Sequence, residues 1–249
     1  MWFEPASAGE PLGSFRLTRE ERVILVQQFA PQADGGQFRT NVPNCEPDLR
    51  ISTVYAPQPF AVVTQVAETS IISQVVLARF PEGDDEGGET LTMFGGSVAV
   101  DDRFCPADQV RSGAEDVYIL QGQTLVSGTE LVYDNVSGLA DLTGPVRLLR
   151  QAQSEGPEIT ASSESLVYDV ETELSTLTGA VVVRSAERTS YADSLVLDEE
   201  AGVATLLGSP ARSVLGEDEI RGNRLLYYLD TDDVIVEGAV TGTLELDLD

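Results

Sequence analysis

The side chains that could perform chemistry in this sequence are carboxylates, because it contains 42 aspartates and glutamates and no histidine. Histidine is the usual base near neutral pH, so its absence excludes Ser-His-Asp and Cys-His catalytic sites. A pair of carboxylates could still hydrolyse a glycoside. However, Asp134, Asp169 and Asp198 stand one each at the ends of successive predicted strands, which indicates an architectural role. We therefore predict that the protein is not an enzyme and has no catalytic residue.

Two acidic runs and two cysteines are the remaining candidates for metal or redox chemistry. The runs at 84–89 and 230–233 gather oxygen ligands, but neither has the spaced calcium loop with its distal glutamate, so we interpret them as solvated turns. Cys45 and Cys105 match no metal-binding spacing. They could form one disulfide or remain two buried thiols, and both alternatives stay open. No metal and no cofactor is predicted.

The net charge of the chain restricts the kinds of partner that it can bind. Fifteen basic residues, all of them arginine, give the 249-residue chain a formal charge of -27, which repels the phosphates of nucleic acid. No stretch approaches the length of apolar sequence that spans a bilayer. The segment 1–20 also lacks a secretion pattern, although a signal or anchor before Met1 stays open. We expect a chain that is soluble as given and does not bind nucleic acid.

A repeat organises the second half of the chain. Four segments share the template Leu-x-Tyr, a polar turn and Leu-x-Gly, with Leu and Val among the substitutes. The position numbers of the leading leucines rise in steps of 35, 29 and 30, and those of the glycines after each turn rise in the same steps. A period of about 30 residues is typical of a supersecondary unit stacked in series. The leading leucines are Leu131, Leu166, Leu195 and Leu225, and the glycines are Gly144, Gly179, Gly208 and Gly238.

Within each unit, apolar residues alternate with period two, which predicts a β-hairpin. The glycine predicts a bend or bulge in the return strand. A small residue three positions before each leading leucine would allow close approach at a bent corner. The residue after each leading leucine is also apolar, so the strand is either sandwiched between two layers or lines an apolar groove. The small residues are Gly128, Ser163, Ala192 and Gly222, and the extra apolar ones are Val132, Val167, Val196 and Leu226.

The repeat weakens toward the N-terminus. Residues 51–80 alternate well enough for further strands, and 81–89 is an acidic, glycine-rich loop. At 17–29, Thr18 and Glu21 could form a helix capping box, but "RVILVQQF" has strand composition, and we favour a strand. We predict an N-terminal region at 1–88, with strands of the same stack, and a β-repeat domain at 89–249.

The repeat resembles the OstA/LptA family of lipopolysaccharide-transport proteins. The segments that carry the resemblance are "GTELVYDNVSGLADLTGPVRLL", "SESLVYDVETELSTLTGAVVVR", "ADSLVLDEEAGVATLLG" and "GNRLLYYLDTDDVIVEGAVTG". The resemblance implies an all-β fold: an elongated, V-shaped β-jellyroll, a solenoid-like stack of antiparallel hairpins with an apolar interior. It also implies the periplasm or cell envelope as location.

The function implied by this resemblance is a non-enzymatic bridge that shields acyl chains of lipopolysaccharide or a related lipid in an apolar groove. Its partners would be that lipid, other envelope transport components bound through edge strands, and further copies joined head to tail. The alternative is a structural β-repeat protein with a closed, dry core. The expected lipid-binding residues are Leu131, Tyr133, Leu142, Leu166, Tyr168, Leu177, Leu195, Leu197, Leu206, Leu225, Tyr227 and Val236.

Overall fold

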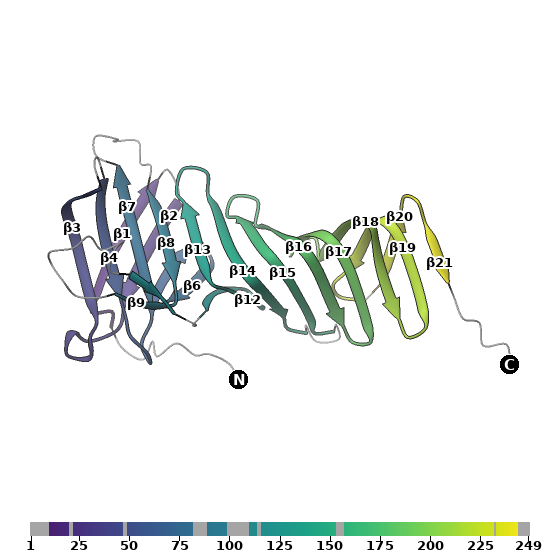
Figure 1. The fold of residues 1–249 in the computed structure, drawn as a ribbon, viewed down its shortest axis with the longest axis horizontal. Coiled ribbons are helices and arrows are strands. Elements are labelled where there is room, and N and C mark those ends of the chain that lie inside the picture. Colours follow the sequence, from purple (N-terminus) through teal and green to yellow (C-terminus); the bar gives the residue numbers. More distant parts are fainter. Residues whose placement is uncertain are drawn as a thin grey trace. The chain divides into compact units, whose positions relative to one another are not determined.

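The computed structural model is built almost wholly of antiparallel β-strands (Figure 1). It divides into two compact units, of which unit 1 comprises 1–122 and 127–141, and unit 2 comprises 123–126 and 142–249. The boundary expected between 88 and 89 stays a prediction. The residues that the structure describes are 10–19, 22–46, 49–81, 89–98, 110–113, 116–152, 157–231 and 233–243.

Unit 1 pairs strands that are often distant in the sequence. Besides the hairpins β1–β2, β3–β4, β5–β6 and β7–β8, it contains the antiparallel pairs β2–β5, β4–β7, β6–β11 and β8–β13, and a separate β9–β10 ribbon. A short 3-10 helix follows β2. The elements are β1 (Gly13–Arg19), β2 (Arg22–Gln28), η1 (Gln32–Asp34), β3 (Gln37–Glu46), β4 (Leu49–Tyr55), β5 (Val62–Val66), β6 (Thr69–Ser73), β7 (Val75–Pro81), β8 (Thr90–Phe94), β9 (Gly96–Val98), β10 (Val110–Ser112), β11 (Val117–Gln121) and β13 (Glu130–Asp134).

The core of unit 1 covers some strands on both faces. Four consecutive residues at the start of β7, from Val75 to Ala78, are all buried. Successive side chains of a strand point to opposite faces, so apolar layers lie on both sides of β7. The segment with the ambiguous capping box is confirmed as strand, because Thr18 on β1 pairs with Val23 on β2.

Unit 2 is a simpler succession of hairpins, in which each strand from β15 to β19 pairs antiparallel with the next (Figure 1). The last of these, β19, also pairs with β20 and β21. The predicted all-β stack of antiparallel hairpins is thereby confirmed, and the last three copies of the repeat each form one hairpin in unit 2. Its strands are β14 (Leu139–Arg150), β15 (Ile159–Asp169), β16 (Leu174–Ser185), β17 (Arg188–Asp198), β18 (Val203–Leu215), β19 (Asp218–Tyr228), β20 (Val234–Glu237) and β21 (Thr241–Thr243); β12 (Thr124–Gly128) and β14 have residues in both units.

Each strand from β15 to β19 breaks its pairing register once, near its middle. The shifts fall at Gly179 in β16 and Gly208 in β18, where the sequence predicted a bend, and at the small residues Ser163 and Ala192 in their neighbours. Gly179 has a positive φ of 86°, which glycine adopts without strain. The breaks divide the sheet into two arms. Arm A contains 165–169, 174–178, 194–198, 203–207, 224–228 and 234–237, and arm B contains 159–162, 181–185, 188–192, 211–215, 218–222 and 241–243. We count the end of β14, 146–150, with arm B because Leu148 and Arg150 line the interior together with Ile159 and Ala161 of that arm.

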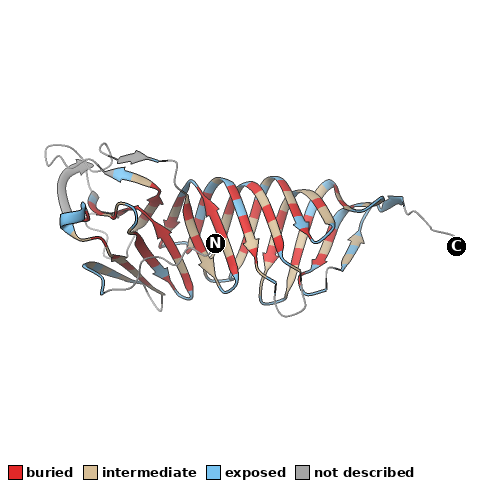
Figure 2. Cartoon of the chain, turned by 90° about the horizontal axis from the view of Figure 1, so that it is seen from below, coloured by how far each residue is buried: buried red, intermediate tan, exposed pale blue. Residues whose placement is uncertain are grey.

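The strands of unit 2 bury one face only. Buried and half-buried residues alternate along β15 and β16, and Figure 2 shows the same alternation of red and tan along the neighbouring strands. Val167 and Val196, expected to be apolar on a second covered face, are only half-buried. The interior of unit 2 is therefore the space that the inner faces of the two arms share.

Some expectations fall on residues whose side chains the structure does not describe. The acidic run at 84–89 lies almost wholly outside the described residues, as do Cys105 and the side chain of Cys45. The two alternatives for Cys45 and Cys105, one disulfide or two thiols, therefore both stay open.

Candidate functional site

Six of the twelve residues expected to bind lipid form one continuous row on the inner face of arm A. Each member lies directly across from the next on the neighbouring strand, and the first five are buried. The last, on β20, is half-buried at the edge of the sheet. The row consists of Leu166, Leu177, Leu195, Leu206, Leu225 and Val236.

A second row runs beside it and alternates large side chains with small ones. It contains the predicted residues Tyr168, Leu197 and Tyr227, all buried, with Ser175 and Ala204 between them. Sequence reasoning missed the two small members, although each stands two residues before a leucine of the first row. Large side chains opposite small ones can interdigitate, which fills most of the space along the row.

The remaining predicted residues do not all join these rows. Leu142 is buried in unit 2, but Leu131 and Tyr133 belong to unit 1. There they lie on β13, opposite Met93 and Leu91 of β8. The first copy of the repeat thus places its leading pair in the core of unit 1.

Arm B contributes the opposite wall of the interior. Its residues were not among those predicted from the sequence to bind lipid. Its inner face begins apolar, with Ala161 next to Val183, and becomes polar at Ser190 and Ser213. The hydroxyls of these two serines are hydrogen-bonded at 2.9 Å. The inner face of arm B is therefore most apolar in the first half of unit 2.

A cavity of about 10 Å³ lies in the interior between the arms, close to the smallest space that holds one water molecule. Residues from both arms line it, so the arms do face one another across it. The lining residues are Leu148, Arg150, Ile159, Ala161, Val183, Leu195, Leu197, Ala204, Tyr227 and Leu229.

One member of this lining, Arg150, is charged. It is 3% exposed and is the only charged residue among the buried ones that the structure describes. Its Nε donates to Oε2 of Glu199 at 3.3 Å, and its Nη2 donates to Oδ1 of Asp230 at 3.5 Å. Arg150 ends arm B, whereas Glu199 and Asp230 stand in turns at the ends of arm A strands. The ion pairs thus join the two arms at the side where their turns lie, which we call the mouth.

The aspartates that end the strands stabilise turns, as their spacing predicted. Oδ1 of Asp198 accepts from the backbone N–H of Ala201 at 2.8 Å, and Oδ1 of Asp169 accepts from that of Glu171 at 2.9 Å. Asp134 accepts from the backbone N–H of Val136 at 2.8 Å. Side-chain bonds of this kind are a common way to fix tight turns.

Glu219 and Arg221 form an ion pair on arm B. The hydrogen bond that Arg221 donates lowers the pKa of the Glu219 carboxyl below its usual 4.5. Both side chains are partly or well exposed, at 27% and 49%, so the pair belongs to the surface and not to the interior.

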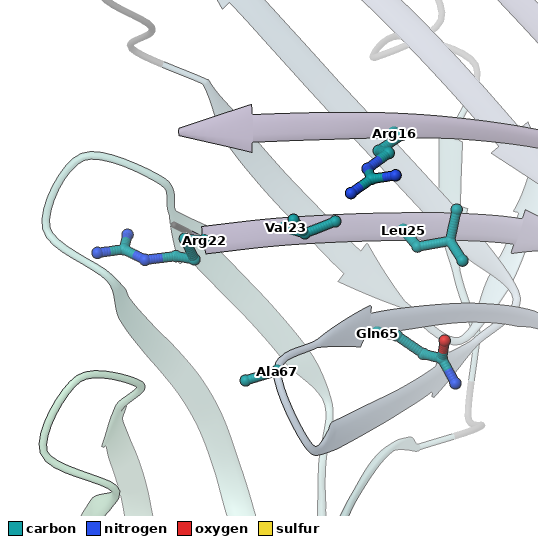
Figure 3. A pocket seen from close by; sticks show the side chains of 6 residues that line it. All are labelled: Arg16, Arg22, Val23, Leu25, Gln65 and Ala67. Atoms are coloured by element: carbon teal, nitrogen blue, oxygen red, sulfur yellow. The ribbon is translucent and has the colours of Figure 1, made fainter. Parts of the chain in front are cut away.

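Unit 1 carries a separate hollow of about 400 Å³ on the outer face of β1, β2 and β5. Arg16, Leu25 and Gln65 lie in one row across these strands, with Val23 and Ala67 beside them (Figure 3). Arg22, at the other end of the hollow, points away from them and donates to the carbonyl oxygen of Asn135 at 2.8 Å. None of the predicted site residues lines this hollow.

No known protein-family model matches the sequence, and no curated protein matches it. A comparison with solved structures does find a similar one: the crystal structure of LptH, the LptA homologous periplasmic component of the conserved lipopolysaccharide transport device from Pseudomonas aeruginosa. The match is to a lipopolysaccharide-transport protein. The two chains are 12% identical, the alignment covers 72% of this chain and 95% of that one, and the TM-score is 0.34.

Among the described residues, three or more potential metal ligands nowhere gather into a site. Within the same residues, no helix has the length and apolar character required to cross a membrane.

Proposed function

We propose that this protein is a non-enzymatic lipid-binding module of the cell envelope, and that unit 2 shields acyl chains between its arms. The observation that carries the proposal is the unbroken inner row from Leu166 to Val236, which crosses six strands in register. An acyl chain laid along such a row gains about 0.8 kcal/mol for each methylene it buries. The lipid we favour is lipopolysaccharide or a related envelope lipid, and the location we favour is the periplasm.

A structural protein with a closed core is the second candidate. The observation that favours it is the small residual cavity, about 10 Å³, because an acyl chain cannot enter unless the arms part. Under the first proposal the arms separate to admit lipid. Under the second the rows simply pack against one another, as in any protein core.

Two adjacent leucines on β18 allow a matched test. Leu206 is fully buried on the inner face, while Leu207 is 40% exposed on the outer face. We expect the purified protein to retain lipid, measured by native mass spectrometry and by extraction, and to bind a fluorescent fatty-acid probe that added lipid displaces. Leu206→Asn should weaken probe binding strongly, and Leu207→Asn should leave it unchanged. If the wild-type protein retains neither lipid nor detergent, the closed-core alternative holds.

The partners are part of the same proposal. In the described part of the chain β20 pairs with β19 alone, so its other edge is open to a further strand. Ile235 on β20 is 48% exposed and Val240 is 58% exposed, which gives this edge apolar side chains to bury. We propose that copies of the chain, or other envelope components, add strands here. Light scattering should show mass increasing with concentration, and a monomer at every concentration would contradict self-association.

A further inference from the structure

Arg150 occupies an environment that a structural ion pair alone does not explain. A buried guanidinium is costly unless all its N–H groups are paired. Its Nε and Nη2 reach carboxylates, but its Nη1 is buried without a hydrogen-bond partner among the described residues. The group therefore has hydrogen-bonding capacity left on the inner side of the mouth.

The partners that Arg150 does have lie toward solvent. The side chain of Glu199 is 28% exposed and that of Asp230 is 69% exposed, whereas that of Arg150 is only 4% exposed. Glu199 is held in place by a hydrogen bond from the Thr124 hydroxyl. The Asp230 carboxylate is hydrated when released, so another anion can replace it at small cost, and Glu199 is the carboxylate that competes with such an anion for Arg150.

The same side chain borders apolar space. Leu148, Leu197 and Leu229 line the cavity beside Arg150. A cation at the mouth and apolar side chains behind it are complementary to a molecule with an anionic head and an apolar tail. A neutral head would leave Nη1 unpaired, and a cationic head would be repelled.

The overall charge of the chain is a second reason to expect a binding site for an anionic headgroup at Arg150. At a formal charge of -27 the protein repels anionic headgroups from most of its surface. A lipid carrier of this composition needs a local cation wherever an acidic lipid enters. Arg150 supplies that cation at the mouth of the interior.

We propose that Arg150 binds the phosphate or carboxylate headgroup of an acidic amphiphile, exchanging Glu199 and Asp230 for it, while the acyl chain enters between the arms. Because this exchange removes the ion pairs that join the two arms, headgroup binding also allows the arms to separate at the mouth. The inference rests on the proposed lipid-binding function, and it adds the class of headgroup and the residue that selects it.

The test compares three probes on the full chain by isothermal titration calorimetry: dodecyl phosphate and dodecyl maltoside, each below its micelle concentration, and inorganic phosphate. We expect dodecyl phosphate to bind at least tenfold more tightly than dodecyl maltoside, and inorganic phosphate to bind more weakly than either. Equal affinity for inorganic phosphate and dodecyl phosphate would overturn the inference in favour of a free-phosphate site.

Two variants with opposite expected effects make the test specific. Arg150→Gln should weaken dodecyl phosphate binding about tenfold or more, the range typical of a charged hydrogen bond, and leave dodecyl maltoside unchanged. Glu199→Gln removes the competing carboxylate and should tighten dodecyl phosphate binding. Arg147→Gln is the matched control, because Arg147 is an exposed arginine on the same strand and its loss should change neither affinity.

The outcomes separate this inference from the proposed function. If Arg150→Gln weakens both amphiphiles equally, or if Glu199→Gln weakens dodecyl phosphate binding or leaves it unchanged, Arg150 is structural and only this inference fails. If the wild-type protein binds neither amphiphile, the proposed function itself fails. Should Arg150→Gln not fold, as judged by circular dichroism, the sign of the Glu199→Gln effect decides.

Discussion

Units 1 and 2 are built from the same kind of strand but close their cores differently. In unit 1, β7 is buried on both faces, and strands far apart in the sequence are neighbours. In unit 2, the strands from β15 to β19 follow one another in order and bury one face. A strand covered on both sides has no free face to offer a ligand. The proposal of lipid binding therefore rests on unit 2, where the inner faces of the two arms line a common interior.

The difference also concerns how each core could open. Separating the arms of unit 2 would break contacts between side chains and the ion pairs of Arg150, but would leave each arm's backbone hydrogen bonds intact. Opening unit 1 would require breaking sheet pairs such as β4–β7. Breaking side-chain contacts costs far less free energy than breaking all the backbone hydrogen bonds between two paired strands. Under the proposed function, unit 2 exchanges this packing for contacts with a lipid.

The largest effect is expected from a charge in the core of unit 1. Val76 is fully buried between neighbours that are buried too, so Val76→Asp should cost more than about 4 kcal/mol and abolish the cooperative unfolding of unit 1. Thermal unfolding followed by circular dichroism measures this. Val136→Asp, at a position that is 50% exposed in a turn of the same unit, should leave the transition within a few degrees of wild type. Similar losses in both variants would contradict the burial described for β7.

A truncated leucine in each unit tests whether only unit 2 exchanges its packing for a ligand. Leu91 in unit 1 and Leu225 in unit 2 are both fully buried, and replacement of either by alanine should cost about 2–5 kcal/mol. Dodecyl maltoside below its micelle concentration should restore much of the loss in Leu225→Ala, because its alkyl chain can fill the vacated space, and none in Leu91→Ala. Urea unfolding with and without the detergent measures both. Equal rescue of the two variants would remove the distinction between the units.

The bends that create the arms should tolerate substitution less well than the turns. A Cβ on Gly144 would lie closer than 3.0 Å to the carbonyl oxygen of Glu164, so the backbone must shift, and Gly144→Ala should cost about 3 kcal/mol. Gly216 has a positive φ of 60° but open space around it, so Gly216→Ala should cost about 1 kcal/mol. Chemical denaturation of both variants gives the comparison. A larger loss at Gly216 would mean that backbone angle, and not crowding at the bend, limits the repeat.

The sequence predicted unit 2 far better than unit 1, for a physical reason. The row from Leu166 to Val236 forms because each strand pairs with its neighbour in the chain. A repeat in the sequence is therefore enough to bring equivalent residues opposite one another. The pairing of β2 with β5, or of β4 with β7, joins segments with other strands between them and leaves no periodic trace. Arg150 was missed because its partners lie 49 and 80 positions away, at no spacing that a motif would record. Leu131 was grouped with the leucines of unit 2 because the repeat does not reveal that its first copy contributes its leading strand to unit 1.

The smallest effect separates the two kinds of carboxylate at the mouth. Asp198 accepts a backbone hydrogen bond within its own turn, a role that the amide oxygen of asparagine can also fill. Asp198→Asn should therefore be nearly neutral, and Asp198→Ala should cost about 1 kcal/mol. Asp230 stands in the fourth repeat, where the position equivalent to Asp198 is Tyr228, and it reaches Arg150 instead of capping its turn. Asp230→Asn should thus change the affinity for dodecyl phosphate, measured by calorimetry, more than it changes the free energy of unfolding, measured in urea. A larger effect on unfolding than on affinity would mean that Asp230 only stabilises its turn.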